Sequence, residues 1–433
     1  MSNKEELNEY KSSYTIIFSI NYLMQGLVIS IFAILLPVFL IGYMGALDAS
    51  DLAFLATIIS APTLLKIFYG LLTDKIGTKQ MGRRKPWILV SGIISGLLFI
   101  IFPFLFTPTN ILMVSAFFGF IIFVSIYMID TATDAFLLDI CPKEKLGRTQ
   151  GLCFSTRAIG TITGGPIFLY LVVIIEILTV QVVFVLMGIL LIIVAILILT
   201  IKAIETPLEV KLGLHLKSMF NTSRDWKLYL YSIFNSLLNQ VVFIFLSIYI
   251  LIQMHLIEFK PGGSLSLGGT EMSIYIYQAN IGLITSAGIM LGSILGGRIS
   301  DLLSRKIGVY ITFLISTITI LLILIDVNLI GIGMLLFFAA LIGFAMGLRL
   351  STYTAVAGQM SKKHPEMIGT FFAICMMFAN IGVVMGLLIT GIIFSLTASF
   401  MVVFIFMAII QNIGLLFFFL LDPKDYEPKL DQK

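Results

Sequence analysis

The stretch "LLKIFYGLLTDKIGTKQMGRRKPW", residues 64–87, decides the fold of this chain. Its first half is apolar over several helical turns, whereas its second half is one of the most basic segments of the sequence. Gly70 and Asp74 mark the change between the two, and Lys66 stands among apolar residues nearly two turns earlier. This pattern is typical of an apolar helix that ends at a charged surface.

Parts of this pattern recur in the second half of the chain. The glycine and the aspartate of "GLLTD" return in "GRISD", again at the end of an apolar run and before basic residues. The offsets between the copies are nearly constant and indicate two related halves of six elements each. The pairs are Gly70 and Asp74 with Gly297 and Asp301 (offset 227), Glu144 and Gly147 with Glu366 and Gly369 (offset 222), and Asn21 and Gln25 with Asn235 and Asn239 (offset 214).

The composition places the chain in a membrane. Of its 433 residues, 59% are hydrophobic and only 12% are charged, and the mean hydropathy is +1.08. A soluble domain is about half apolar and a quarter charged. The net charge of +4 comes from lysines and arginines in loops and needs no nucleic-acid partner. We therefore expect a polytopic helical protein with the lipid bilayer as its surroundings.

The apolar runs predict twelve transmembrane helices, because each run is about 20 residues long, the length that crosses the hydrocarbon core. The fifth and sixth are separated only by "IIEILTVQ". The spans are 14–42, 52–72, 87–106, 111–138, 149–173, 178–201, 227–254, 273–297, 308–326, 328–357, 369–394 and 398–421.

The basic residues predict the topology. All but four of the 27 lysines and arginines fall in the N-terminus, in the even-to-odd connections or in the tail; the exceptions are Lys66, Arg157, Lys260 and Arg349. By the positive-inside rule both termini are cytoplasmic. We expect no cleaved signal peptide, a plasma-membrane location, and halves at 1–201 and 227–421, joined by a linker at 202–226 and followed by a cytoplasmic tail at 422–433.

The sequence lacks the motifs of several common functional sites. The three cysteines show no paired spacing and the three histidines lie far apart, so no disulfide framework and no metal site is predicted. There is no helical H-E-x-x-H and no Walker motif, which argues against an intramembrane hydrolase and against ATP as the energy source. We expect neither an enzyme nor a protein with a cofactor.

The G-x-x-x-D motif with its basic cluster resembles the signature between helices two and three of the major facilitator superfamily. The stretches "GRRKPW" and "DTATDAFLLDICPKEKLGRTQGL" are similar to the branch of muropeptide permeases, acetyl-CoA transporters and folate-biopterin transporters. "GRRKPW" also resembles the glycoside-pentoside-hexuronide cation symporters. The resemblance implies two six-helix bundles and gating by the repeated motifs. The implied gating residues are Gly70, Asp74, Arg83, Arg84, Asp301 and Arg305.

Four charged residues are predicted at similar depth in helices two, four and five. Asp130 and Asp134 are four apart and share one helix face. Lys66 and Arg157 can neutralise them, either as a structural network or as a coupling site. A carboxylate that loses its cation when helices move changes its proton affinity. Lys66 could instead extend along its helix toward Asp74.

Arg349 and a set of amides complete the candidate site. Arg349 has no acidic residue in its own span, so its compensation must come from another helix, water or a bound anion. Each amide could bond a neighbouring helix, but the set lies near mid-depth and could line a cavity. Its members are Asn21, Gln25, Asn235, Asn239, Gln278 and Asn380.

These features predict a secondary transporter for a small anionic or polar organic solute, coupled to protons at Asp130 and Asp134, with sodium as the other ion considered. Uptake of a cationic solute in preference would contradict the anionic assignment. Two alternatives stay open: a sugar or glycoside cation symporter, and a non-transporting assembly factor, since "DTATDA" also resembles chlorophyll-complex assembly proteins. We expect the protein to be a monomer.

Overall fold

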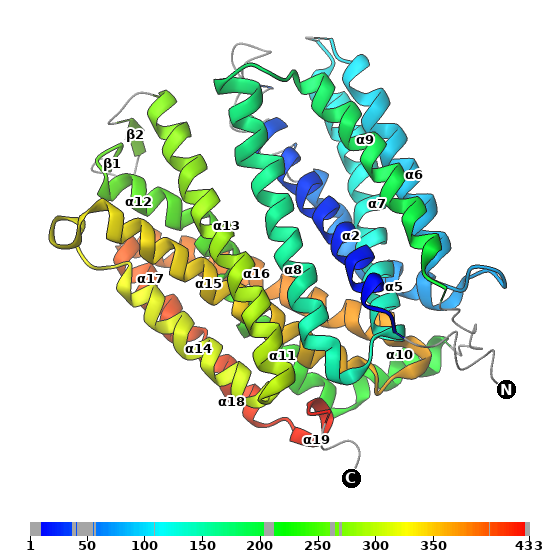
Figure 1. The fold of residues 1–433 in the computed structure, drawn as a ribbon. Helices are drawn as coiled ribbons and strands as arrows, with labels where there is room; N and C mark the ends of the chain where they lie inside the picture. Colours follow the sequence, from blue (N-terminus) through cyan, green and yellow to red (C-terminus); the bar gives the residue numbers. More distant parts are fainter. Residues whose placement is uncertain are drawn as a thin grey trace. The chain divides into compact units, whose positions relative to one another are not determined.

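The computed structural model describes residues 10–36, 40, 55, 58–107, 109–202, 212–259, 265–267, 271–397 and 399–428. Within these residues the regular secondary structure is helical apart from one small two-stranded hairpin and one isolated β-bridge, and short loops connect the helices (Figure 1). The all-α membrane fold predicted from the apolar runs is confirmed.

The first half of the chain contains helices at all six predicted spans. Two spans continue from an α-helix into a π-helix, a wider turn that occurs often near functional sites. The elements are α2 (Ser12–Ser30) with a π-helix at Ile31–Leu35, a 3-10 turn (Ala61–Leu65) with α5 (Lys66–Lys75), α6 (Lys85–Ile101), α7 (Ile111–Ile140), α8 (Leu146–Ile162) with π-helices at Thr163–Ile167 and Tyr170–Ile174, and α9 (Val180–Leu197).

The second half repeats this organisation. A short helix, α10 (Leu212–Asn221), lies in the predicted linker. The elements that follow are α11 (Ser223–Val241), a π-helix (Val242–Leu246), α12 (Ser247–Gln253), β1 (Ile257–Phe259), β2 (Leu265–Leu267), α13 (Glu271–Leu302), α14 (Arg305–Leu322), α15 (Val327–Ser361), α16 (Ile368–Thr397), α17 (Phe400–Ile410), α18 (Ile413–Phe419) and α19 (Pro423–Tyr426).

Nine helical segments of the described residues are long and apolar enough to cross a membrane. The three other predicted spans are also occupied by helices, at residues 58–75, 146–174 and 223–253. All three contain an interruption: a 3-10 turn with Pro62, two π-helices of which one contains Pro166, and a π-helix after Val241. Each of the twelve predicted spans therefore corresponds to helix in the structure.

The chain divides into two compact units. Unit 1 comprises Met1–Lys143, Thr156–Ser218 and Met360–Ile374, and unit 2 comprises Glu144–Ser155, Met219–Gln359 and Cys375–Lys433. The division follows the repeat except at two short segments, which group with the opposite half of the sequence. These two segments carry the repeated "EKLG" and "EMIG" motifs.

Unit 1 is held together by aromatic rings and by close helix packing. Phe32 meets Phe99, Phe123 and Phe184 edge-on, with ring centroids 5.8, 5.3 and 6.2 Å away, an arrangement that suits the ring quadrupoles. A Cβ on Gly26 would collide with the carbonyl oxygen of Arg157, so α2 and α8 touch backbone to backbone. Glycine is what permits this approach.

In unit 2, glycines again bring two helices together. A Cβ on Gly292 of α13 would collide with the carbonyl of Phe344, and one on Gly347 of α15 would collide with the carbonyl of Ile289. Helix α15 also bends near its start, where Gly331 has a φ of 76° that favours glycine.

The hairpin follows α12 and was not predicted. Strands β1 and β2 are antiparallel, with Ile257 opposite Leu267, and lie beside the adjoining ends of α12 and α13 (Figure 1). This connection also holds Lys260, the basic residue placed in an odd-to-even loop, which lies outside the described residues.

Candidate functional site

Three of the four deep charges form one cluster in unit 1. Lys66 Nζ lies 2.7 Å from Asp130 Oδ2, and the Arg157 guanidinium lies 3.6 Å from Asp130 Oδ1. The Lys66 and Asp130 side chains are 8% and 4% exposed, whereas that of Arg157 is 26% exposed. Asp130 thus has one tight cationic partner and one looser, more accessible partner. Lys66 therefore forms its ion pair with Asp130 and does not extend along its helix toward Asp74.

Asp134 lies one turn from Asp130 on α7 and has a different partner. It accepts a hydrogen bond from the hydroxyl of Tyr22 on α2. The described residues give Asp134 no ion pair within salt-bridge distance, so the two carboxylates of the cluster are not equivalent. Tyr22 was not predicted, because an aromatic residue in an apolar helix carries no sequence signal of a polar role.

Local backbone features position the cluster. Lys66 is the first residue of α5 and follows the 3-10 turn that contains Pro62. Its ammonium also lies 5.7 Å from the centre of the Tyr127 ring on α7, a cation–π distance. Arg157 reaches Asp130 from α8, whose backbone is drawn against α2 at Gly26. Three other helices, α2, α5 and α8, therefore converge on the two aspartates of α7.

Arg349 belongs to a separate polar network in unit 2. Its guanidinium donates to Gln411 Oε1, to Ser316 Oγ at 3.2 Å and to the carbonyl of Asn235. It also lies 4.5 Å from the centre of the Phe313 ring. Arg349 is 3% exposed, and no carboxylate in the described residues forms an ion pair with it. Its compensation comes from neutral acceptors on neighbouring helices.

Gln411, which accepts from Arg349, lies at a break in the twelfth predicted span. Helix α17 ends at Ile410 and α18 begins at Ile413, and between them the side-chain amides of Gln411 and Asn412 donate to the carbonyl of Ala408 at 3.3 and 2.7 Å. Side chains that insert into the backbone hydrogen-bond ladder interrupt a helix in this way. The break was not predicted, although the polar pair Gln411 and Asn412 interrupts an otherwise apolar run.

We expect Arg349→Lys to lower the melting temperature of the purified protein nearly as much as Arg349→Met. A lysine cannot supply the planar fork that reaches both Gln411 and Asn235, and an unsatisfied buried polar group costs about 1–3 kcal/mol. Thermal unfolding in detergent measures the effect, with the exposed Arg298→Lys as the control. A wild-type melting temperature for Arg349→Lys would show that charge alone is enough.

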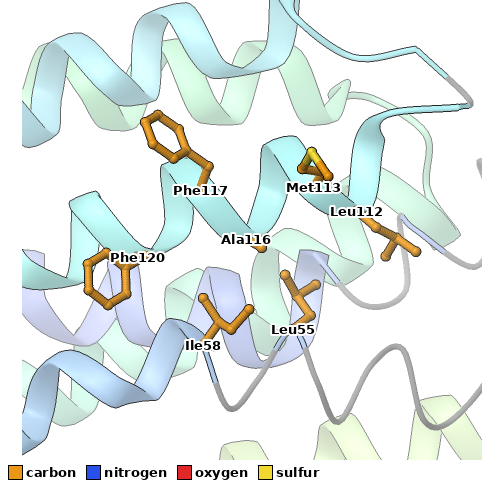
Figure 2. Close-up of a pocket in the computed structure, with 7 residues that line it drawn as sticks. All are labelled: Leu55, Ile58, Leu112, Met113, Ala116, Phe117 and Phe120. Carbon is orange, nitrogen blue, oxygen red and sulfur yellow. The ribbon is translucent and has the colours of Figure 1, made fainter.

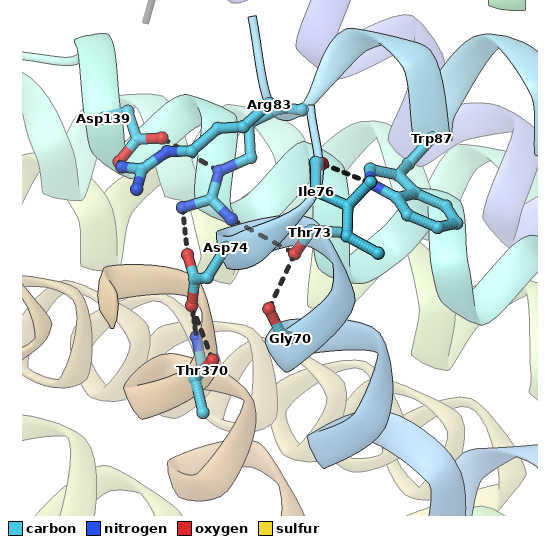
Figure 3. A network of polar contacts seen from close by, with 9 residues as sticks. Gly70, Thr73, Asp74, Ile76, Arg83, Trp87, Asp139 and Thr370 are labelled. Carbon is cyan, nitrogen blue, oxygen red and sulfur yellow. Dashed lines mark hydrogen bonds and ion pairs between the residues drawn. The ribbon is translucent and has the colours of Figure 1, made fainter. Parts of the chain in front are cut away.

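Asp74 joins three elements of unit 1 (Figure 3). Its Oδ1 lies 2.5 Å from the Arg84 guanidinium, and both side chains are fully buried. Its Oδ2 accepts from the backbone N–H and the hydroxyl of Thr370, both at 2.6 Å. Thr370 lies in the first turn of α16, where a carboxylate is favoured by the helix dipole. Gly70 leaves room for this contact, because a Cβ there would lie 2.9 Å from the Cα of Thr370.

Asp301 makes the matching contact in unit 2. Its carboxylate accepts from the backbone N–H groups of Gly147, at 2.9 Å, and Arg148, at 2.6 Å, in the first turn of α8. The aspartate of each G-x-x-x-D copy thus meets the helix start that follows the "EKLG" or "EMIG" motif of the other half. The two repeated motifs are partners of each other, a relation that their separate positions in the sequence do not reveal.

The basic residues after the two aspartates have different partners. Arg84 and Arg83 contact the two oxygens of Asp139, at 2.9 and 3.1 Å. In the second copy, Arg305 is fully buried and donates to the carbonyl of Tyr426 at 2.8 Å, while the Glu427 carboxylate accepts from the N–H of Lys306 at 2.8 Å. Arg305, predicted as a gating residue, therefore also ties the segment after α18 to the start of α14.

The predicted amides are divided between the two units. Asn21 and Gln25 are buried inside unit 1, and Asn235 is buried in unit 2 beside Arg349. Asn239 and Asn380, both half-buried, belong to unit 2 as well. The side chain of Gln278 lies outside the part of the chain that the structure describes.

A cavity of about 590 Å³ lies elsewhere in unit 1 (Figure 2). Its lining is apolar, and none of the predicted site residues touches it. Its residues are Leu55, Ile58, Leu112, Met113, Ala116, Phe117 and Phe120. A polar solute would find no hydrogen-bonding side chain there, so this hollow is not the candidate site. The described residues contain no group of three His, Cys, Asp or Glu side chains that could hold a metal ion.

Comparison with known proteins identifies the family. The family model described as Major Facilitator Superfamily matches residues 18–277 and 228–433. The chain belongs to the major facilitator superfamily, as the resemblance of its G-x-x-x-D motif implied. The closer resemblance to particular branches stays a prediction.

Solved structures share this fold. A crystal structure of the E. coli fucose:proton symporter FucP has a TM-score of 0.68 at 13% identity, covering 93% of this chain and 97% of that one. A second FucP structure, in the outward conformation, has a TM-score of 0.64 at 14% identity with the same coverage. At this identity the likeness concerns the fold alone. No curated protein sequence matches the chain.

Proposed function

We propose that the chain is a proton-coupled secondary transporter that moves a small polar organic solute by alternating access. The observation that carries the proposal is the inequality of the two buried carboxylates on α7. Asp130 faces Lys66 and Arg157, whereas Asp134 accepts from a tyrosine hydroxyl. A carboxylate inside a membrane span costs free energy to bury, and such carboxylates commonly belong to ion or proton pathways.

Arg157 is the partner that can leave. Its contact with Asp130 is longer than that of Lys66, and its side chain is the most exposed of the three deep cations. If helix movement or a solute draws Arg157 away, Asp130 loses one of its two positive neighbours and its proton affinity changes. Proton binding at Asp130 is then coupled to solute binding, because Arg157 contacts either the Asp130 carboxylate or the solute.

The same geometry limits the class of solute. Lys66 is engaged by Asp130, and Arg349 is enclosed by neutral acceptors, so Arg157 is the one of these three cations with an accessible face. One partly free cation suits a polar solute with at most one anionic group. A neutral sugar or glycoside is also compatible with one accessible cation. The structural likeness to a fucose:proton symporter supports this alternative.

Asp74 and Asp301 would control access. Each carboxylate binds the start of a helix: Asp74 accepts from one backbone N–H and one hydroxyl, and Asp301 from two backbone N–H groups. These hydrogen bonds would break if the helices moved apart. The distribution of basic residues supports placing these contacts on the cytoplasmic side, with both termini on that side, in the plasma membrane. We also propose that the protein works as a monomer.

The test uses purified protein in liposomes that contain a pH-sensitive dye. A panel of amino sugars, peptidoglycan fragments, glycosides, pterins, coenzyme A esters and simple organic anions is first screened by thermal shift at pH 5.5 and 7.5. A hit should drive proton entry in wild type, and Asp134→Asn should bind it yet move at least tenfold fewer protons. Tyr22→Phe is the matched control, because it removes the hydroxyl and leaves the carboxylate.

Other outcomes assign the protein differently. Full proton movement by Asp134→Asn would place coupling elsewhere, and solute movement that follows sodium would replace the proton. If no solute on the panel binds or is transported, the hypothesis of a non-transporting assembly factor is favoured. Equal loss in Arg157→Gln for anionic and neutral solutes would show that Arg157 does not select charge.

A further inference from the structure

Unit 1 contains a second polar feature that the charge cluster does not explain. A small cavity of about 10 Å³ lies between α2, α6, α7 and α9. Two polar side chains, Asn21 and Gln25, share its lining with eight apolar residues. Gln25 is 1% exposed, and neither atom of its side-chain amide has a hydrogen-bond partner among the residues that the structure describes. A buried amide without partners is costly, so the site needs a polar occupant.

We propose that this cavity is a hydration site that holds one water molecule on the amides of Gln25 and Asn21. Asn21 donates through its Nδ2 to the carbonyl of Ile17 at 3.0 Å, which leaves its oxygen able to accept. A water placed between the residues can bond that oxygen and one atom of the Gln25 amide. The cavity volume matches the least that one water requires, about 10–15 Å³, and two polar partners are the usual minimum.

The size of the cavity also decides against an organic solute. A space that admits one water cannot hold a sugar ring or a carboxylic acid. Asn21 and Gln25, predicted as solute contacts, are therefore assigned to the interior of unit 1. Two of the helices that line the site also carry charge-cluster residues or their partner: α2 carries Tyr22, and α7 carries Asp130 and Asp134.

The first test compares two buried glutamines. Gln150 is also fully buried, and both of its amide atoms lack a hydrogen-bond partner within the described part of the chain, but it lines neither of the two cavities above. Gln150→Met removes an unsatisfied amide and should leave the melting temperature unchanged or raise it. Gln25→Met takes a partner from the water and should lower the melting temperature by about 1–3 °C. A rise in both variants would mean that the cavity is dry and would overturn the proposal.

The second test is direct. An experimental density map of the wild-type protein near 2 Å resolution should contain a compact peak about 2.7–3.2 Å from an amide atom of Gln25. An amide turned to bond a backbone carbonyl, with no such peak, would overturn the proposal even if Gln25→Met is destabilising. Neither measurement depends on a solute, so failure here leaves the proposed transport function standing.

Discussion

Asp130→Asn is expected to abolish solute-driven proton movement and to destabilise the protein by about 3–5 kcal/mol, the usual cost of removing one partner of a buried ion pair. Lys66 would then keep its charge, 8% exposed, with no carboxylate at 2.7 Å. Arg157, whose side chain is 26% exposed, can turn toward water and should contribute less to the loss. Thermal unfolding measures the first effect, and the dye-loaded liposomes measure the second.

The matched control removes both charges. The double variant Lys66→Met/Asp130→Leu should regain most of the lost stability, because a buried ion pair can often be replaced by apolar side chains at little cost. It should still fail to couple, since the carboxylate is gone. If the single variant is as stable as wild type, then Lys66 has another partner. If the double variant still moves protons with solute, Asp130 is not a coupling residue.

The second large effect is expected at Asp74, and it should exceed the effect at Asp301. Asp74→Ala removes one carboxylate from the buried Arg84 guanidinium and both bonds to Thr370, which should cost about 3 kcal/mol or more. Asp301→Ala removes two backbone N–H contacts at a helix start and should cost about 1 kcal/mol. Unfolding of the two variants under the same conditions gives the comparison.

A labelling experiment separates stability from access. Cys153 lies in the segment of α8 that belongs to unit 2 and is fully buried. In a protein with Cys141→Ser and Cys375→Ser, we expect Asp301→Ala to make Cys153 react faster with a maleimide, because the start of α8 loses its anchor. Asp74→Ala, whose contacts lie in unit 1, serves as the comparison. Unchanged reactivity in Asp301→Ala would argue against a gating role for that residue.

The helices themselves were largely predictable from the sequence. Apolar runs of membrane-spanning length have one stable form in hydrocarbon, because every backbone N–H and C=O must be bonded within the segment. For this reason each predicted span contains helix, and the family assignment from the G-x-x-x-D motif is confirmed. The interruption at residues 242–246 was not predictable, because that segment is as apolar as the rest of its run. The break at residues 411–412 has a sequence signal, the polar pair Gln411 and Asn412 inside an apolar run, but the prediction did not use it.

Partners of the charged residues were only partly predictable. The sequence placed Lys66, Asp130 and Arg157 at one depth, and the structure brings them into contact. It could not show that Arg349 donates to Gln411 and to a backbone carbonyl, because neutral acceptors on other helices leave no sequence pattern.

By itself the sequence determined the membrane class, the twelve helices, the duplication and the residues that carry charge into the spans. These follow from hydropathy, from periodicity and from the cost of burying charge, all of which act locally along the chain. Only the tertiary structure decided which group each charge meets: Lys66 with Asp130, Asp74 with the start of α16, and Arg305 with the carbonyl of Tyr426. Such pairings depend on which helix faces approach one another, and that is set by packing across distant parts of the chain.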